Sequence, residues 1–233
     1  MSLEQAITKR LTELTPWRKT SDQITTQGRR PVHEKTFKGV GFPFDGITNL
    51  GNANVIVPLI AESDGTYGSA ILVAQYRPGP EMFLLEFPGG NLKGNESDTG
   101  AALRELVEET GHLPKTLIPL GDATPRDAYL EGAVQSYLAL GSTKAGDQNL
   151  DREEAEQGLF TIVSPISEIA ELMYAGNKNT LGLEYHTSLP SAVAFERAML
   201  YMLPRGLLSE KAHEGIITAQ EKHFTPVLDV QRS

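Results

Sequence analysis

The sequence predicts an α/β protein in which a mixed β-sheet lies between layers of helices. Three observations indicate this class: strand-like segments dominate residues 52–87, a well-capped helix follows, and further strands then precede two apolar helices. This order of elements is typical of an α/β/α sandwich. A hydrophobic content of 39% over 233 residues is ordinary for one large globular domain with an extension.

The expected elements follow one another along the chain. β-Branched and apolar runs predict buried strands at residues 52–62, 70–76, 82–87, 129–140 and 159–163. Apolar residues at helical spacing predict helices at residues 4–15, 167–174 and 191–203, and a short helix within residues 90–111. The polar stretch 17–44 predicts extended segments and loops, and residues after Leu207 show no clear pattern. We therefore expect an N-terminal extension (1–45), a core domain (46–207) and a C-terminal tail (208–233).

Residues 90–111, GNLKGNESDTGAALRELVEETG, contain the most informative pattern. Ser97, Asp98 and Thr99 are good N-cap types, and Gly111 fits the position after a helix end. On the opposite side of this helix from the acidic residues, the expected buried stripe is Leu103, Leu106 and Val107.

The same helix carries three carboxylates on one face. An α-helix advances 100° per residue, so Glu105, Glu108 and Glu109 lie within about 100° of one another. Like charges at this spacing repel each other. A hard cation such as Mg²⁺ or Mn²⁺ reverses that interaction and takes oxygen ligands. The sequence therefore predicts a divalent metal site on this face, next to a glycine-rich turn that allows close approach of a ligand.

The stretch closely resembles the Nudix box, the signature of enzymes that hydrolyse a nucleoside diphosphate linked to another group. It matches at every fixed position and departs from the pattern at His112, where the family usually has an aliphatic residue. The resemblance implies an α/β/α sandwich over roughly residues 45–203 and hydrolysis by water attacking one phosphorus of a diphosphate.

The resemblance also implies roles for residues of the box. Glu105 and Glu109 become direct metal ligands, with Glu108 joining through a metal or a water. The carbonyl of Gly89 is a further expected ligand, beside Gly90 in the glycine turn. Arg104 and Glu96 are expected to form a supporting ion pair that holds the glutamates in place. Arg104 also has the i,i+4 spacing for a simple helix-surface pair with Glu108.

Features outside the box resemble the ADP-ribose pyrophosphatase branch of the family. Gln75-Tyr76-Arg77 ends a strand just before the run Glu86-Phe87-Pro88-Gly89-Gly90, and an extension of some 45 residues precedes the core. The branch usually has alanine where this chain has Gly89, a mild change by sequence alone. The branch implies a homodimer in which the extension helps to form the substrate site. It does not settle the substrate, because other nucleotide sugars or dinucleotides remain open.

The branch resemblance also suggests residues that contact the substrate. Arg77 is a candidate for the diphosphate or the terminal ribose through its guanidinium fork, and is equally readable as a surface arginine. Glu86, in the run that follows it, is a further substrate-binding candidate. Trp17 either stacks on an adenine base or packs at a dimer interface.

A general base is expected on a loop after the box. The segment 150–159, LDREEAEQGL, offers Glu153, Glu154 and Glu156. The position of the strand that follows favours Glu156 when it is set against the family pattern. The alternative that this acidic segment is only a solvated loop stays open.

Composition limits the class of function. The net charge of −9 and the pI of about 5.1 argue against a broad nucleic-acid-binding surface. The chain has no cysteine, no apolar run close to the ~20 residues of a membrane span, and no signal-like N-terminus. We expect a cytoplasmic protein acting on a small-molecule nucleoside diphosphate, without nucleic-acid or membrane partners. The alternatives are a non-catalytic nucleotide-sensing Nudix domain and a Nudix hydrolase of a dinucleotide or coenzyme A.

Overall fold

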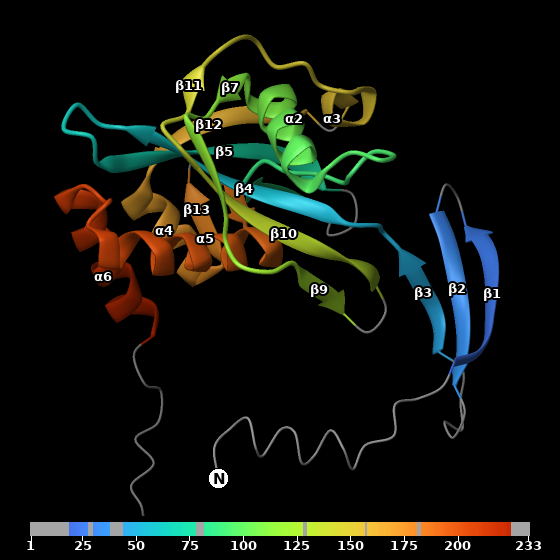
Figure 1. The fold of residues 1–233 in the computed structure, drawn as a ribbon. Coiled ribbons are helices and arrows are strands. Elements are labelled where there is room, and N and C mark those ends of the chain that lie inside the picture. Colours follow the sequence, from blue (N-terminus) through green and yellow to red (C-terminus); the bar gives the residue numbers. More distant parts are fainter. Residues whose placement is uncertain are drawn as a thin grey trace, which may run out of the picture. The chain divides into compact units, whose positions relative to one another are not determined.

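The computed structural model describes residues 19–27, 30–37, 44–77, 82–127, 130–156, 158–180 and 183–224 (Figure 1). The chain divides into two compact units, one of residues 1–51 with 125–132 and the other of residues 52–124 with 133–233. The helix expected at 4–15 lies outside the described residues.

The first unit is built from antiparallel strands. β1 (Lys19–Gln27) pairs with β2 (Arg30–Phe37), and β2 pairs with β3 (Phe44–Asn49). The first two residues of β10 (Leu130–Leu140) run parallel to the end of β3. Strands therefore occupy most of the region for which the sequence predicts extended segments and loops.

The second unit contains a mixed sheet. Its strands are the greater part of β10, β4 (Ala53–Ala61), β5 (Tyr67–Arg77), β6 (Met82–Glu86), β8 (Thr116–Pro119), β12 (Phe160–Pro165), β13 (Asn177–Thr180) and β14 (Leu183–His186). β10 is parallel to β4 and antiparallel to β8, whereas β5 is antiparallel to β4, β6 and β12. β14 is parallel to β6 and antiparallel to β13. The short strands β7 (His112–Leu113) and β11 (Thr143–Lys144) pair separately, and β9 (Thr124–Asp127) borders β10.

Helices cover both faces of this sheet. They are α2 (Asp98–Thr110), α3 (Arg152–Glu156), α4 (Ile166–Ala175), α5 (Leu189–Met202) and α6 (Glu210–His223), with a 3₁₀ turn at Leu203–Arg205. Figure 1 shows α2 on one face and α4, α5 and α6 on the other. The predicted α/β/α sandwich with a mixed sheet is confirmed. No helix in the described part of the chain is both long and apolar enough to cross a membrane.

The side-chain alternation of β4 creates a core on each face. Val55, Val57 and Leu59 join the larger hydrophobic cluster with α4, α5 and α6. Ile56 points the other way and packs with Leu106 of α2. Fully burying one such side chain contributes about 1.5–3 kcal/mol, so α2 is fixed on the sheet mainly by its apolar residues.

The region after Leu207, for which the sequence predicts no clear pattern, forms α6. Ser209 caps this helix by accepting a hydrogen bond from the N–H of Ala212 at 3.4 Å. Ala212, Ile216 and Ala219 are buried in the larger cluster. One face of α6 therefore packs into the core of the second unit. The predicted limits 1–45, 46–207 and 208–233 stay a prediction.

Candidate active site

The helix at the centre of the site has the caps that its sequence predicts. The Ser97 hydroxyl accepts the N–H of Gly100 at 3.1 Å, and Gly111 ends the helix in the left-handed region with φ 68°. The expected buried stripe is only partly correct. Leu106 is buried, but Leu103 and Val107 are half-buried. The second buried flank of α2 instead carries acidic residues, because it lies against the turn at 88–90 and not against solvent.

The turn that faces α2 is fixed to β4. The N–H of Asn54 donates to the carbonyl of Gly90, and the N–H of Ile56 donates to the carbonyl of Pro88, both at 2.9 Å. A Cβ on Gly89 would lie 2.2 Å from the carbonyl oxygen of Asn54, so only glycine fits here without a shift of the backbone.

Glu105 and Glu109 are buried beneath this turn, with relative exposures of 4% and 3%. One oxygen of Glu109, Oε2, accepts the N–H of Gly89 at 2.9 Å. Burial raises the pKa of Glu105, and it raises the pKa of Glu109 well above the ordinary value. The negative charge of Glu105 adds to the rise at Glu109. Two adjacent carboxyls in this setting require a positive partner in order to stay ionised together.

Arg104 is that partner for three of the acidic residues. Its Nε and Nη2 bond both oxygens of Glu96 at 2.9 and 3.0 Å. Its Nη1 contacts Glu105 at 2.8 Å and Glu108 at 2.9 Å, and Nη2 also donates to the carbonyl of Asn91 at 3.2 Å. The hydrogen bonds to Glu96 are the largest cause of the raised pKa of Arg104. Both expected pairings, with Glu96 and with Glu108, occur together.

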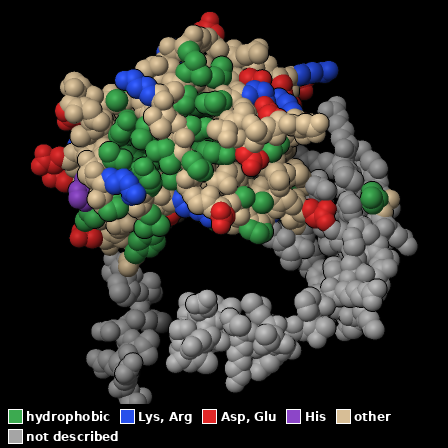
Figure 2. Space-filling view, in the orientation of Figure 1, with side chains coloured by type: hydrophobic (Ala, Val, Ile, Leu, Met, Phe, Trp, Pro, Cys, Tyr) green, Lys and Arg blue, Asp and Glu red, His purple; other side chains and the backbone are tan. Residues whose placement is uncertain are grey.

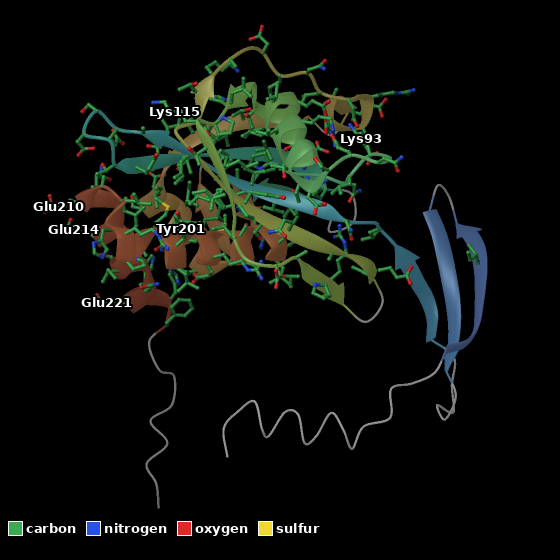
Figure 3. The ribbon with its side chains drawn as sticks, viewed as in Figure 1. Lys93, Lys115, Tyr201, Glu210, Glu214 and Glu221 are labelled. Carbon is green, nitrogen blue, oxygen red and sulfur yellow. The ribbon has the colours of Figure 1, made fainter. Side chains whose placement is uncertain are left out.

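Glu108 lies at the more open side of the cluster. Its carboxylate receives Arg104 and, at 3.5 Å, the Nζ of Lys93, which is labelled in Figure 3. Figure 2 shows acidic and basic side chains gathered at this end of the molecule, over α2 and α3. In this structure Glu108 is thus neutralised by side-chain cations. Lys93 has no predicted role; its place three residues before Glu96 was the available signal in the sequence.

Glu154 of α3 completes the acidic group. Carboxylate oxygens of Glu105, Glu109 and Glu154 all lie within 4.8 Å of one another. Glu156, which the sequence favours as the general base, instead forms an ion pair with Arg152 at 2.7 Å, and 64% of its side chain is exposed. The structure therefore places Glu154, and not Glu156, beside the glutamates of the box. The sequence left Glu154 as an alternative.

Arg77, the last residue of β5, forms an ion pair with Glu86, the last residue of β6. Nε of Arg77 donates to Oε2 of Glu86 at 2.8 Å, and the amide of Gln75 reaches the same oxygen at 3.4 Å. The positive charge of Arg77 opposes part of the rise in the pKa of Glu109 that burial causes. Glu86 is buried and orients Arg77. Gln75 was visible in the sequence as the residue on the same strand face as Arg77.

The donor set fits a hard divalent cation. Glu105, Glu109 and Glu154 offer carboxylate oxygens at close range, and Gly89 lies next to this group, because its N–H donates to Oε2 of Glu109. Mg²⁺ and Mn²⁺ prefer oxygen ligands of these kinds. Trp17, the remaining predicted contact, lies outside the described residues.

Comparison with known protein families identifies the family to which this chain belongs. The NUDIX domain family matches residues 52–179, which is more than half of the chain, and the chain belongs to this family. The match contains the box helix, the glycine turn and α3.

Individual relatives cover shorter stretches. The chain is 34% identical over 116 residues to ADP-sugar pyrophosphatase from Mus musculus, covering 45% of this chain and 53% of that protein. It is 28% identical over 149 residues to ADP-ribose pyrophosphatase from Escherichia coli (strain K12), covering 58% and 65%. It is 28% identical over 117 residues to the methanol dehydrogenase activator of Bacillus methanolicus, covering 49% and 63%. The chain thus spans less than two thirds of the length of these curated relatives.

A solved structure, the crystal structure of an ADP compounds hydrolase, resembles the fold with a TM-score of 0.64 and 18% sequence identity. The similarity covers 84% of this chain and 98% of the other. At this level of identity the likeness concerns the fold alone.

Proposed function

We propose that this protein is a metal-dependent hydrolase of a nucleoside diphosphate linked to another group. ADP-ribose or a related nucleotide sugar is the proposed substrate, cleaved to a nucleoside monophosphate and a sugar phosphate. The observation that carries the proposal is the close approach of Glu105, Glu109 and Glu154 beneath the glycine turn. The printed names of the ADP-ribose and ADP-sugar pyrophosphatase relatives support the substrate class.

The proposed cofactor is Mg²⁺ or Mn²⁺, held by Glu105 and Glu109 together with the carbonyl of Gly89. Glu108 is a more distant ligand in this proposal, because it lies outside the group formed by Glu105, Glu109 and Glu154 and is bonded by both Arg104 and Lys93. When bound, the cation polarises phosphoryl oxygens and lowers the pKa of a coordinated water. The chain itself supplies the orientation: Arg104 holds the carboxylates of Glu96, Glu105 and Glu108.

We assign the general base to Glu154 in preference to Glu156. A carboxylate in this role accepts the proton of the attacking water and must lie beside the reacting phosphorus. Glu154 lies near Glu105 and Glu109, whereas Glu156 bonds Arg152 on an exposed helix surface. In the same proposal the guanidinium of Arg77, oriented by Glu86, binds the diphosphate or the terminal ribose.

A release assay tests the proposal directly. ADP-ribose, ADP-glucose, GDP-mannose, NADH and diadenosine polyphosphates are incubated with Mg²⁺ or Mn²⁺ and, in parallel, with chelator, and the nucleoside monophosphate is measured. We expect metal-dependent AMP release from ADP-ribose that is lost in Glu109→Gln. Cleavage of another compound alone would keep the reaction and discard the proposed substrate.

Matched substitutions in α3 test the assignment of the base. Glu154→Gln is expected to lower kcat by roughly 10²–10⁴-fold, the usual contribution of a general base. Glu156→Gln removes an exposed i,i+4 ion pair and is expected to leave kcat within a factor of about 3, since such pairs are worth a few tenths of a kcal/mol. Equal losses in both variants would contradict the assignment.

Two further statements carry over from the sequence as proposals. A homodimer is expected from the likeness to the ADP-ribose pyrophosphatase branch, and a mass measurement by light scattering checks it. A cytoplasmic location is proposed from the cysteine-free sequence. Binding of nucleotide sugars without turnover by the metal-loaded protein would favour the nucleotide-sensing alternative, with which the activator named among the relatives is compatible.

A further inference from the structure

The backbone carbonyl of Glu109 accepts hydrogen bonds from two side chains that lie far apart in the sequence. The hydroxyl of Thr161, in β12, donates to it at 3.2 Å. The side-chain amide of Gln148, in the loop before α3, donates to the same oxygen. Carbonyls in the last turn of a helix have no partner within the helix, so this oxygen is open to such donors. The two donors flank α3, and with it Glu154, on both sides.

The segment between these two anchors is also held at its ends, where the N–H of Asn149 donates to the carbonyl of Glu108, Leu159 is buried, and β12 pairs with β5 from Phe160 onward. None of the five residues of α3, all of which are described, is buried. A helix of this length is not stable without tertiary support. The position of Glu154 must therefore come from the attachments of the segment to the rest of the protein. The hydrogen bonds of Gln148 and Thr161 both end on Glu109, the residue whose carboxylate lies close to that of Glu154.

Inside the segment, the side chain of Glu154 has a fixed direction. Its Oε2 accepts the N–H of Asp151 at 2.7 Å, and the N–H of Glu154 donates to Oδ1 of Asp151 at 2.9 Å. This reciprocal pair has the form of a capping box at the start of α3. The orientation of the Glu154 carboxylate relative to α3 is thus set locally. Its distance from Glu105 and Glu109 depends on where α3 as a whole is held.

The loop before α3 also follows the end of α2 closely. The N–H of Asn149 donates to the carbonyl of Glu108 at 2.8 Å, and the N–H of Ala145 donates to the carbonyl of Gly111 at 2.8 Å. The Nζ of Lys144 donates to the carbonyl of Thr110 at 3.2 Å. Carbonyls of successive residues at the helix end therefore each receive a donor from this loop or from Thr161. These hydrogen bonds fix the loop against the end of α2 along its length.

We infer that Gln148 and Thr161 are positioning residues, which hold Glu154 against Glu105 and Glu109 by bonding the carbonyl of Glu109. The inference rests on the proposed function, in which Glu154 receives a proton during hydrolysis. The two side chains touch no reacting atom. They act through the placement of α3.

A simple capping role for the two side chains makes a different prediction. If they only satisfied a carbonyl of α2, their removal would lower stability and leave the chemistry of the folded enzyme unchanged. If they hold α3, their removal loosens residues 150–156 and lowers kcat more than it changes KM. A displacement of about 1 Å in a catalytic group is enough to cost on the order of 10²-fold in rate.

The experiment compares Thr161→Val, Gln148→Leu and their double variant with the wild type. Valine keeps the shape of threonine and leucine most of the bulk of glutamine, but neither donates a hydrogen bond. Thr161→Ser restores the hydroxyl. Thr218→Val and Gln220→Leu serve as matched controls on α6, where Thr218 donates to the carbonyl of Glu214 (labelled in Figure 3) and Gln220 to the hydroxyl of Tyr174.

Three quantities are measured for every variant: amide hydrogen exchange of residues 150–156, Mn²⁺ affinity by titration calorimetry, and the kcat and KM for ADP-ribose. Loss of one hydrogen bond is expected to speed exchange in this segment roughly 2- to 10-fold. In the double variant we expect kcat to fall roughly 10- to 100-fold with KM changed less than about 3-fold. Thr161→Ser is expected to behave like the wild type, and both α6 controls to leave exchange at 150–156 and kcat unchanged.

Exchange at 150–156 that stays at the wild-type rate in the folded double variant would overturn the inference. So would faster exchange with an unchanged kcat, because α3 would then be loosened without effect on the reaction. If wild-type protein hydrolyses no diphosphate, the proposed function fails on its own, and with it the catalytic role inferred here; the exchange data then still decide whether the two side chains hold α3. If the double variant does not fold, the single variants and Thr161→Ser give the same comparison.

Discussion

Replacing Gly90 with alanine would put a methyl group against the carboxylate of Glu105. A Cβ at this position lies 2.4 Å from Oε1, 2.6 Å from Cδ and 3.0 Å from Oε2 of Glu105. Ordinary van der Waals contact begins at 3.4 Å, so the carboxylate must retreat by about 1 Å, the difference between 3.4 and 2.4 Å. The same Oε1 contacts Nη1 of Arg104 at 2.8 Å, and this contact is lost in the shift.

The expected cost falls on metal binding and not on folding. The three nearest atoms all belong to the movable side chain of Glu105, so the backbone has no need to shift. Mg²⁺ requires oxygen ligands at about 2.0–2.1 Å in near-octahedral geometry, which a displaced ligand cannot provide. Disturbing the support of a metal ligand typically weakens metal affinity by roughly 10- to 100-fold. We expect that loss for Mn²⁺ binding by Gly90→Ala, with a melting temperature in chelator close to the wild-type value.

Gly89→Ala is the matched control, because its new methyl group meets backbone. The Cβ would lie 2.2 Å from the carbonyl oxygen of Asn54 and 3.0 Å from Cα of Val55. Overpacking against atoms that cannot rotate away costs about 1–3 kcal/mol. For a chain of this size that lowers the melting temperature by roughly 2–12 °C. Alanine at position 89 is a mild change by sequence alone, but it is thus expected to lower the stability of this chain.

Titration calorimetry with Mn²⁺ and thermal melting in chelator, applied to both variants, separate these effects. A Gly90→Ala protein that binds Mn²⁺ as tightly as the wild type would refute the reasoning. The same conclusion would follow if Gly90→Ala melted as far below the wild type as Gly89→Ala, since the clash would then be carried by the fold.

Three further predictions concern the ion pairs and the cofactor. Arg104→Lys replaces a fork that bonds both oxygens of Glu96 with a point charge, so we expect kcat/KM to fall roughly 10- to 100-fold in initial-rate assays. Hydrogen bonds from Lys222 and His223 lower the pKa of Glu171, so their stabilisation is present above the ordinary pKa of 4.5 and is lost as pH falls through the lower folded pKa. Denaturant melts of Glu171→Gln should therefore show a loss of up to about 1 kcal/mol at pH 7 that shrinks as the pH falls below 4.5 and is gone below the folded pKa; a loss that does not change with pH would contradict this reasoning. Mg²⁺ or Mn²⁺ at 100 times its Kd should stabilise the wild type by about 2.7 kcal/mol, measured as a rise in melting temperature, and should have no such effect on Glu109→Gln.

The box helix could be predicted from sequence because its signals are local. Ser97 and Gly111 mark its ends through contacts made within four residues, and the structure shows both caps. The fold class followed from the order of strands and helices, which the mixed sheet and its two helical layers confirm. Both inferences need only short-range chemistry and periodicity.

The side of α2 that is buried could not be predicted from its periodicity. Apolarity favoured Leu103 and Val107, but the structure buries Glu105 and Glu109 more deeply. The cause is a tertiary contact: the turn at 88–90, itself bonded to β4, covers the acidic flank. Hydrophobic patterning has no information about a backbone segment that arrives from another part of the chain.

The sequence could not decide between Glu154 and Glu156 for a related reason. Two residues along a helix are separated by about 200°, so a small error in alignment moves the carboxylate to the opposite side. The strand that guided the sequence argument lies after α3 and does not fix its rotation. That rotation depends on Asp151 and on the anchors at Gln148 and Thr161, which meet a carbonyl of a distant helix.

The third difference between expectation and structure is α6, which the sequence could have predicted. Ser209 is a good N-cap, and Ala212, Ile216 and Ala219 have the i, i+4, i+7 spacing of a buried helix face. The stripe is narrow and two of its residues are small, so it did not stand out against the polar residues around it. In the structure, small side chains suit this position, because a Cβ on Gly215 would lie 2.2 Å from that of Ser167 in α4.

The electrostatics of the site show why its stability and its proposed chemistry are linked. Arg104 lies within hydrogen-bonding distance of Glu96, Glu105 and Glu108 and so compensates that side of α2. The charge of Glu109 is less well compensated. Its carboxylate accepts the N–H of Gly89 and faces further carboxylates, and its pKa is raised well above the ordinary value. The apolar residues of α2 pack on the sheet and contribute free energy that offsets part of the cost of burying such a group. A divalent cation at Glu109 would supply the charge that Arg104 supplies elsewhere, so the position that is least compensated in the fold is also the one where we propose the metal binds.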